Sequence, residues 1–421
     1  MLSSYPDPMP RRAVDLRAAV VAAAALLTAD VSLAADTYFI PEIDLRAEYN
    51  SNFAMEQDDG GSTDLSGAIV DAQALIGIDT PRSKTSIRPR LKWQEYPDSE
   101  DTLGIEPEPL EAFLLLRSEY EWERSNALVI GRYSLQDSIN SETPSGVFDP
   151  LDPLFGSDPD AAQIFVGETV ERFELRPTFT HAVTERIRAG AEFLYQGARY
   201  DSDGAQNNTD FDFTQAEGFL AWALNPVSDF TAGAYVSKYE AKDDSAETDS
   251  YGGRIRYAYR WSKVAGLEAT MFHESSDITD FVPVRSEEST SDWGGTLTAY
   301  RRQDLGAWRF TLGRRFIPTG SGGKATSDQL RLQYDRDLSE RMVFSSAARY
   351  ETQAALTQAG ARDDRDYARV DLSLEWMLTP TWYVGGGYSY IWQDREEDPS
   401  AVDNNRVYVS VGYRGLQRPR R

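Results

Sequence analysis

Apolar and polar residues alternate along most of the chain from Tyr38 onward. The alternating runs are about ten residues long, which is the length that a tilted β-strand needs to cross the hydrocarbon core of a bilayer. Clear examples occupy residues 43–49, 70–78, 87–93, 255–261 and 407–413. Because successive side chains of a strand point to opposite faces, this pattern predicts strands with one apolar and one polar face.

The segments between these runs are of two kinds, which alternate along the chain. Short turns are expected near residues 81–84, 123–126, 181–186, 225–229, 262–266, 304–307, 338–341 and 379–381. Longer polar loops are expected near residues 51–63, 97–109, 140–167, 201–210, 241–250, 276–292, 318–325, 351–365 and 393–404. About eight turns and nine loops require about eighteen strands, with both ends of the chain on the short-turn side. The predicted fold is all-β, a transmembrane antiparallel up-and-down β-barrel with short periplasmic turns and longer external loops.

The tryptophans give an independent indication of the same fold. Those beside predicted short turns are Trp122, Trp222, Trp261, Trp308, Trp376 and Trp382, and those near long loops are Trp93, Trp293 and Trp392. Indole rings at both ends of the strands are typical of the two interfacial girdles of a membrane barrel. The alternative is a soluble sheet with ordinary aromatic residues at its strand ends.

Charged residues decide which face of each strand is inside. Arg254 and Arg256 alternate with Ile255 and Tyr257, and an arginine facing lipid near the bilayer midplane would cost roughly 2 to 4 kcal/mol. We therefore expect a lumen lined by Asp44, Arg46, Glu48, Arg88, Arg90, Lys92, Arg172, Glu174, Arg176, Arg254, Arg256, Arg331, Asp371 and Glu375. Side chains alone do not fill a barrel of this strand number, so water occupies the interior unless a loop folds in.

The longest predicted loop, residues 140–167, is also the most apolar one. It contains Phe148, Leu151, Leu154 and Phe155 among several prolines. Apolar residues in an external loop favour burial, and folding into the barrel mouth would provide it. The pattern therefore predicts a constriction formed by these four residues, with packing over the rim as the alternative.

The N-terminal segment carries an export signal. Arg11, Arg12 and Arg17 precede an apolar run at residues 18–27, and small residues follow up to Ala35. The run is shorter than the roughly 20 residues of a spanning helix, so it indicates a signal peptide rather than an anchor. We expect a cleaved signal peptide at residues 1–35, with Met9 as an alternative start to Met1, and a barrel at residues 36–421. The predicted location is the outer membrane of a Gram-negative bacterium.

Composition excludes several classes of function. Lys and Arg total 43 against 68 for Asp and Glu, so nucleic acid would be repelled. The chain has no cysteine, which excludes a lipoprotein anchor, disulfides and thiolate metal sites. The two histidines, His181 and His273, form no HExxH motif or acid–base constellation, so no enzyme activity, cofactor or metal site is predicted.

The long loops are acidic, as in Asp394, Glu396, Glu397 and Asp398. Such carboxylates could bind calcium or join lipopolysaccharide through divalent cations, whereas the plainer interpretation is a solvated, self-repelling surface. Outer-membrane lipid and lipopolysaccharide are the expected surroundings of the barrel.

Four segments of the chain carry a family resemblance. They are Tyr49, Asn50, Ser51 and Asn52 at the end of the first strand, residues 378–382 at the last short turn, residues 387–390 after it, and residues 405–414 in the final strand. In these segments the chain resembles the family called β-barrel porin type 2, whose genes often lie among exopolysaccharide genes. The resemblance implies a conduit for secreted polysaccharide, sometimes beside a periplasmic polysaccharide-export protein. Many outer-membrane barrels end on an aromatic residue that the insertion machinery recognises, whereas this chain ends in a basic tail at residues 415–421. Tyr413 is then the residue expected to be recognised.

Three functions are consistent with the sequence. The resemblance favours an exopolysaccharide conduit, while the charged lumen alone favours a general or solute-selective diffusion porin. A structural or adhesive barrel with a plugged lumen is the third. Guanidinium and carboxylate groups can bind the hydroxyl groups of sugars and small ions alike, so the lining does not separate the first two.

Overall fold

A computed structural model describes residues 35–53, 55, 64–97, 99, 109–137, 168–202, 209–243, 245–280, 286–319, 323–355, 364–395 and 400–416. Eighteen strands run in chain order. They are β1 (Asp36–Asn50), β2 (Leu65–Asp79), β3 (Ser83–Glu95), β4 (Leu110–Glu121), β5 (Ser125–Asp137), β6 (Glu168–Ala182), β7 (Ile187–Ser202), β8 (Phe211–Asn225), β9 (Ser228–Ala241), β10 (Ala246–Ser262), β11 (Ala265–Asp280), β12 (Ser286–Gln303), β13 (Gly306–Thr319), β14 (Gly323–Ser339), β15 (Met342–Ala355), β16 (Arg365–Met377), β17 (Trp382–Arg395) and β18 (Val402–Arg414). The described residues contain no helix that is long and apolar enough to cross a membrane.

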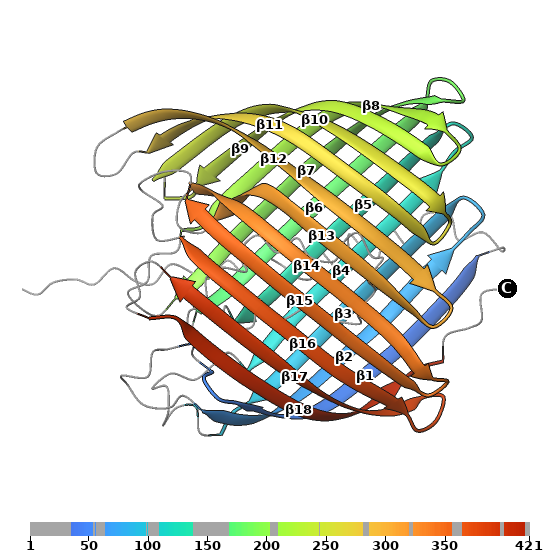
Figure 1. The fold of residues 1–421 in the computed structure, drawn as a ribbon, viewed down its shortest axis with the longest axis vertical. Coiled ribbons are helices and arrows are strands. Elements are labelled where there is room, and N and C mark those ends of the chain that lie inside the picture. Colours follow the sequence, from blue (N-terminus) through green and yellow to red (C-terminus); the bar gives the residue numbers. More distant parts are fainter. Residues whose placement is uncertain are drawn as a thin grey trace, which may run out of the picture.

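Each strand pairs antiparallel with its neighbours in sequence, and the sheet closes on itself (Figure 1). Closure is made by β1 and β18, whose register runs from Glu42 opposite Arg414 to Asn50 opposite Arg406. Closure leaves no free edge along the length over which neighbouring strands pair, so the backbone groups there are satisfied within the sheet. The fold class predicted from the sequence is confirmed.

The connections separate by length between the two ends of the barrel. Those at the end where the chain enters β1 and leaves β18 contain two to four residues, for example residues 226–227 between β8 and β9. Those at the other end range from three residues to thirty, the longest being residues 138–167 between β5 and β6. All eight predicted short turns are therefore confirmed.

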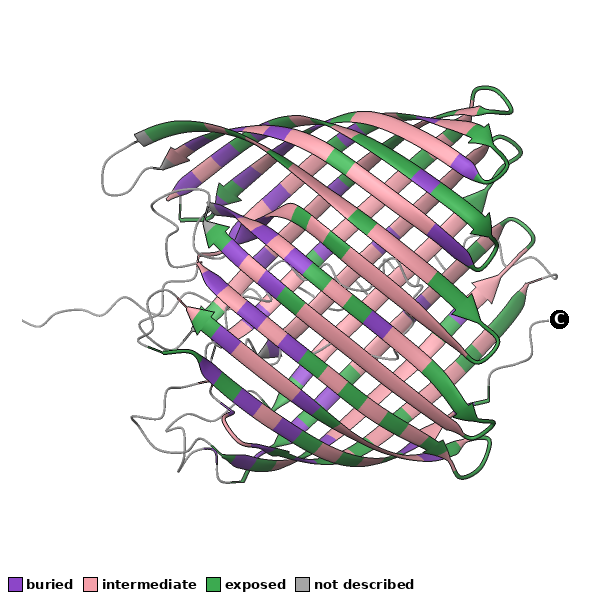
Figure 2. Cartoon of the chain, viewed as in Figure 1, coloured by how far each residue is buried: buried purple, intermediate pink, exposed green. Residues whose placement is uncertain are grey.

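The two faces of the wall differ in chemistry. On β1, Ile43 and Leu45 are 45% and 49% exposed on the outside, while Asp44 and Arg46 between them point to the lumen. Burial alternates in this way along most strands (Figure 2). By the same phase, the nine tryptophans belong to the outer face or to the turns. An apolar outer band around a polar lumen is the arrangement of an outer-membrane barrel, and this chain is a β-barrel of the Gram-negative outer membrane.

Three of the predicted external loops are too long. Residues 241–250 reduce to a connection at 242–245, and residues 276–292 to one at 281–285, because β10, β11 and β12 continue past the apolar band. Their outer ends are rich in Ser, Thr, Asp and Glu. Where both faces of a strand meet water, its residues no longer alternate between apolar and polar, although the backbone hydrogen bonds continue. The sequence pattern therefore predicted loops at these strand ends. The third case, residues 318–325, is described below.

Candidate functional site in the lumen

The strand register gives the position of every residue predicted to line the pore. All fourteen lie in the inward phase of their strands, opposite the exposed apolar set. Glu48, Lys92 and Glu174 are buried, whereas Arg256 is exposed. The structure brings Asp44, Arg46, Arg90, Lys92 and Glu375 together around one recess in the wall.

The hairpin of β13 and β14 leaves the wall at its outer end. β13 pairs with β12 only from Gly306 to Arg314, and residues 315–319 of β13 pair with β14 alone. The outer half of β12 pairs only with β11, and β12 diverges from β13 toward the end with the long connections (Figure 1). The tip of the hairpin is buried: Thr319 is 3% exposed and Lys324 is 6% exposed.

The buried tip contacts the inner faces of β9, β10 and β11, which are not its neighbours in the sheet. Tyr239 on β9 donates a hydrogen bond of 3.0 Å to the carbonyl oxygen of Thr319. The Lys324 ammonium lies 2.9 Å from Ser250 Oγ on β10 and 2.8 Å from Glu274 Oε1 on β11. Because these partners are all in the inward phase of their strands, the tip lies inside the lumen. Residues 318–319 and 323–325, the described parts of the predicted external loop at 318–325, are therefore strand residues inside the lumen, and the prediction of an external loop there is wrong.

An apolar patch on the inner wall receives this tip. Phe211, Phe213 and Tyr239 belong to a buried cluster on β7 to β10, and the Lys324 ammonium lies 5.5 Å from the centre of the Phe213 ring. Apolar side chains facing a water-filled lumen would be unfavourable, so covering them stabilises the in-folded hairpin. The hairpin narrows the outer part of the pore.

Three arginines form a lateral row on the inner wall. Arg331 on β14 is directly opposite Arg349 on β15, and Arg349 is opposite Arg369 on β16. Arg349 binds Glu351, with Nε 3.0 Å from Oε2, and Arg369 binds Asp371, with Nη2 2.7 Å from Oδ1. Like charges directly opposite each other destabilise a sheet. The barrel therefore holds this row at some expense of stability.

Further arginines surround the row. Arg315, on the part of β13 that leaves the wall, interacts electrostatically with Glu351 on β15 first, and also with Arg349 and with Arg176 on β6. Sequence order places β6 and β13 seven strands apart, so the in-folded hairpin brings cationic groups from distant walls together. Within four residues of the row along these strands, the described inward-facing arginines at 309, 315, 331, 349, 365 and 369 outnumber the carboxylates at 335, 351 and 371.

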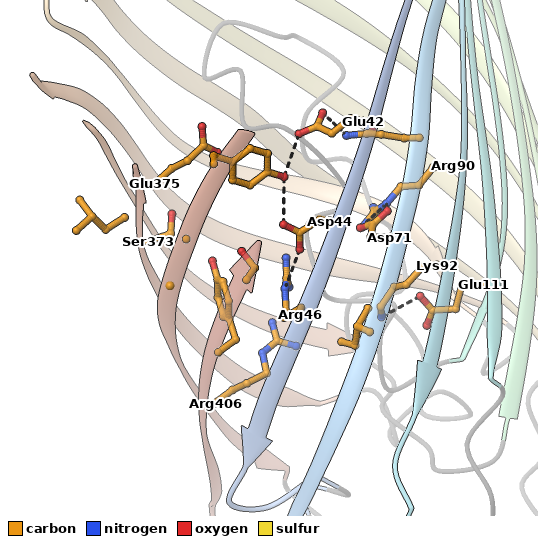
Figure 3. A pocket seen from close by; sticks show the side chains of 18 of the residues that line it. Glu42, Asp44, Arg46, Asp71, Arg90, Lys92, Glu111, Ser373, Glu375 and Arg406 are labelled. Atoms are coloured by element: carbon orange, nitrogen blue, oxygen red, sulfur yellow. Dashed lines mark hydrogen bonds and ion pairs between the residues drawn. The ribbon is translucent and has the colours of Figure 1, made fainter. Parts of the chain in front are cut away.

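The recess around Asp44 and Arg46 extends from β16 across the β18–β1 seam to β4, so it shares β16 with the arginine row (Figure 3). Arg90 makes a bidentate pair with Asp71, with Nε–Oδ1 at 2.8 Å and Nη2–Oδ2 at 2.5 Å. Lys92 pairs with Glu111 at 3.1 Å. Carboxylates and cations alternate there, so this wall differs from the arginine-rich one.

The predicted constriction residues Phe148, Leu151, Leu154 and Phe155 lie outside the described residues. The hairpin constriction was missed, although its sequence carries a signal: residues 316–325 contain one charge, Lys324, whereas the other long loops are acidic. The sequence analysis also missed three lumen-lining residues, Arg349, Arg369 and Arg406. Their inward phase follows from the alternation along their strands, since Asp371 faces inward and Val407 faces outward.

Neither a metal cluster nor a lumen-facing histidine is found among the described residues. No group of three or more His, Asp or Glu residues in the described ranges is arranged to hold a metal ion. His181 lies at the end of β6, where its Nδ1 is 2.9 Å from Ser125 Oγ. His273 lies on the outer face of β11 and packs against Trp293. Neither imidazole faces the lumen.

Comparisons with known proteins give matches among solved structures alone. No family model matches the chain, and no curated protein matches it. The crystal structure of Pseudomonas aeruginosa OpdK with vanillate is 11% identical, covers 89% of this chain and 98% of its own, and has a TM-score of 0.43. P. aeruginosa OccK2 (OpdF) in complex with glucuronate is 11% identical, with coverages of 90% and 99% and a TM-score of 0.43. Acinetobacter baumannii OccAB3 is 11% identical, with coverages of 89% and 98% and a TM-score of 0.42. The finer resemblance to β-barrel porin type 2 stays a prediction.

Proposed function

We propose that the protein is a diffusion pore for small hydrophilic solutes, with a preference for anions. The observation that carries the proposal is the row of Arg331, Arg349 and Arg369 beside a lumen narrowed by the β13–β14 hairpin. A barrel of eighteen strands is too wide to be filled by its own wall side chains. Water and solutes therefore pass close to the row.

Anion preference follows from the charge of the narrowed segment. Arginine keeps its charge at all physiological pH values and offers several N–H donors in a fixed plane, which suits carboxylate and phosphate groups. A guanidinium about 8 Å from a passing anion attracts it by about 0.5 kcal/mol even at the dielectric constant of water. The carboxylates of Glu351 and Asp371 offset two of the three charges, so the row and its bound carboxylates attract an anion with a net charge of +1.

Exopolysaccharide export takes second place in this proposal. The export function and its periplasmic polysaccharide-export partner were both implied by the family resemblance alone. A hydrated polymer needs an unobstructed path, and the tip at Thr319 and Lys324 is bound inside the lumen by contacts to three strands. The narrowed lumen favours the diffusion-porin alternative, in which small solutes are the partners of the pore.

The decisive experiment measures the reversal potential of the reconstituted barrel in a potassium chloride gradient. The wild-type pore is expected to show anion selectivity. Replacing Arg331, Arg349 or Arg369 with glutamine should lower the anion-to-cation permeability ratio at least about twofold each, from the Coulomb estimate above. Arg82→Gln, in the exposed turn between β2 and β3, is the matched control. A cation-selective wild-type pore, or a triple variant with unchanged selectivity, would refute the proposal.

A further inference from the structure

The outer face of the barrel carries a polar hollow beside the β2–β3 and β4–β5 turns. It has a volume of about 550 Å³ and is lined by Arg82, Trp122, Glu123, Arg124, Ser125 and Phe179. Trp122 and Phe179 are exposed on the outer face, with ring centres 6.4 Å apart. The short turns of an outer-membrane barrel lie on the periplasmic side, and aromatic rings of this kind mark the membrane interface. The hollow is therefore at the depth of the headgroups of the periplasmic leaflet.

The two arginines of this hollow are available to a ligand. Arg82 and Arg124 come from different turns, and both are exposed. Neither guanidinium makes an ion pair or a side-chain hydrogen bond with a described residue. With Glu123 as the one carboxylate of the lining, two cations against one anion leave a net charge of +1. Guanidinium groups match the geometry of phosphate oxygens, so the hollow suits an anionic phosphate group.

An apolar trough, about 510 Å³ in volume, adjoins this hollow and shares Phe179 with it. Four small residues of its outward-facing lining flank the rings of Phe179 and Phe193, namely Ala127, Ala191, Ala216 and Gly218. A Cβ added at Gly218 would meet nothing within 4 Å, so the wall is open at this point. Glu192 and Glu217 also border the trough, but they belong to the inward phase of β7 and β8.

The hollow and the trough together have the depth of one lipid leaflet. From Arg124 in the turn to Val129 beside the trough, five steps along β5 cover about 16 Å. With a strand tilt of about 40°, this corresponds to about 13 Å of depth. Half of the hydrocarbon core of a bilayer is about 15 Å thick. The groove is thus cationic at headgroup level and apolar over most of the depth of an acyl chain.

We propose that this groove binds one anionic phospholipid of the periplasmic leaflet. The phosphate accepts hydrogen bonds from Arg82 and Arg124, and one acyl chain lies in the trough. Within a bilayer, close packing rather than the hydrophobic effect holds an acyl chain against the wall, and small residues permit the close approach. The bound lipid links the β2–β3 turn to the β4–β5 turn. The groove faces lipid and not the lumen, so this inference does not rest on the proposed solute pore.

Native mass spectrometry of the intact barrel, released from detergent micelles with added phosphatidylglycerol, tests the proposal. The first phosphatidylglycerol is expected to bind more tightly than any later one. Arg82→Gln and Arg124→Gln should each weaken its binding about fivefold, which is the contribution of one arginine close to an anionic headgroup. Ala191→Leu and Ala216→Leu fill the trough without changing any charge, and they should weaken the same binding step.

Two matched variants serve as controls. Arg341 follows Glu340 in the exposed β14–β15 turn as Arg124 follows Glu123, so Arg341→Gln removes the same charge away from the groove. Ala348 lies between Leu332 and Val370 on the outer face of β15, so Ala348→Leu enlarges a lipid-facing residue elsewhere. Both variants should bind the first lipid as wild type does. Each variant is checked for folding by its heat-sensitive electrophoretic mobility.

Two other probes define the ligand. Glycerol phosphate carries the phosphate without acyl chains and should not displace the lipid at equal concentration. Phosphatidylethanolamine has no net charge and should bind more weakly than phosphatidylglycerol.

Several results would overturn the proposal. One is the absence of a tightly bound first lipid, and another is an equal loss in Arg341→Gln and Arg124→Gln, which would indicate surface charge alone. Folded Ala191→Leu and Ala216→Leu variants with wild-type binding would show that no chain occupies the trough. Displacement by glycerol phosphate, or equal binding of the two lipids, would contradict an anionic phospholipid as the ligand.

Discussion

Replacing Lys324 with methionine should release the tip of the β13–β14 hairpin from the inner wall. The Lys324 and Glu274 side chains are 2% and 7% exposed, with Nζ and Oε1 2.8 Å apart. Methionine keeps most of the length of the side chain but removes the ammonium. The ion pair and the hydrogen bond to Ser250 are then lost together.

The magnitude follows from the burial of the pair. Removing one partner of a buried ion pair costs about 3 to 5 kcal/mol because the other charge is left without compensation. Glu274 keeps hydrogen bonds from Tyr235 at 3.0 Å and Ser276 at 3.3 Å. We therefore expect a loss at the lower end of this range, about 3 kcal/mol. At about 1.4 kcal/mol per factor of ten, about 3 kcal/mol shifts the balance toward the released tip roughly a hundredfold.

Single-channel recording in planar bilayers measures this shift. The Lys324→Met pore is expected to show a larger or more frequently fluctuating open conductance than wild type. The Lys324→Met/Glu274→Met double variant should return toward wild type, because it removes both charges and leaves an apolar contact on the Phe213 side. Lys238→Met is the matched control, since this lysine pairs with Glu240 and Glu247 at 2.7 and 2.8 Å but is 42% exposed.

Unchanged conductance and noise in Lys324→Met, with a correctly folded barrel, would refute the reasoning that the ion pair holds the tip. The eighteen strand pairings do not involve the Lys324 ammonium, so folding should survive. If Lys324→Met and Lys238→Met changed the conductance equally, the loss of a positive charge would explain the change, and release of the hairpin tip would not.

Three further predictions concern the barrel itself. Cysteine at Arg90 should react with a water-soluble maleimide, whereas cysteine at the adjacent Leu91 should be shielded by lipid; reversed labelling would mean a register shifted by one residue. Gly412→Ala places a Cβ 2.1 Å from Cζ of Tyr383, so urea unfolding should show a free energy of unfolding lower by about 1 to 3 kcal/mol. The control Gly218→Ala adds a Cβ with nothing within 4 Å, and it should unfold like wild type. Unboiled and boiled samples should migrate differently in detergent electrophoresis, and identical mobility would argue against a closed barrel.

The sequence predicted those features that depend on neighbouring residues. Strand phase follows from Arg254 and Arg256 alternating with Ile255 and Tyr257, because lipid rejects the charged set. Short turns follow because the strands must reverse within a few residues at the periplasmic side. The outer strand ends were predicted less well, since Ser, Thr and Asp residues in water show no alternation there.

The features of the candidate site depend on residues far apart in the chain. Lys324 meets Glu274 only because the hairpin leaves the wall, and nothing within residues 316–325 specifies that partner. Arg331, Arg349 and Arg369 are each recognisable as lumen-facing, but their alignment needs the register of three strands. The recess requires barrel closure, which brings Arg406 of the last strand beside β1.

The central claim, a narrowed lumen that passes small solutes, is tested most directly by the size limit of permeation. Liposomes containing the purified barrel are loaded with radiolabelled solutes of graded size, from acetate and β-alanine through disaccharides to long polysaccharide fragments, and their efflux is compared with that from protein-free liposomes. The account predicts rapid efflux of the smallest solutes and retention of the polysaccharide. Efflux of polysaccharide at a rate comparable to that of acetate, or no efflux of any solute, would contradict it.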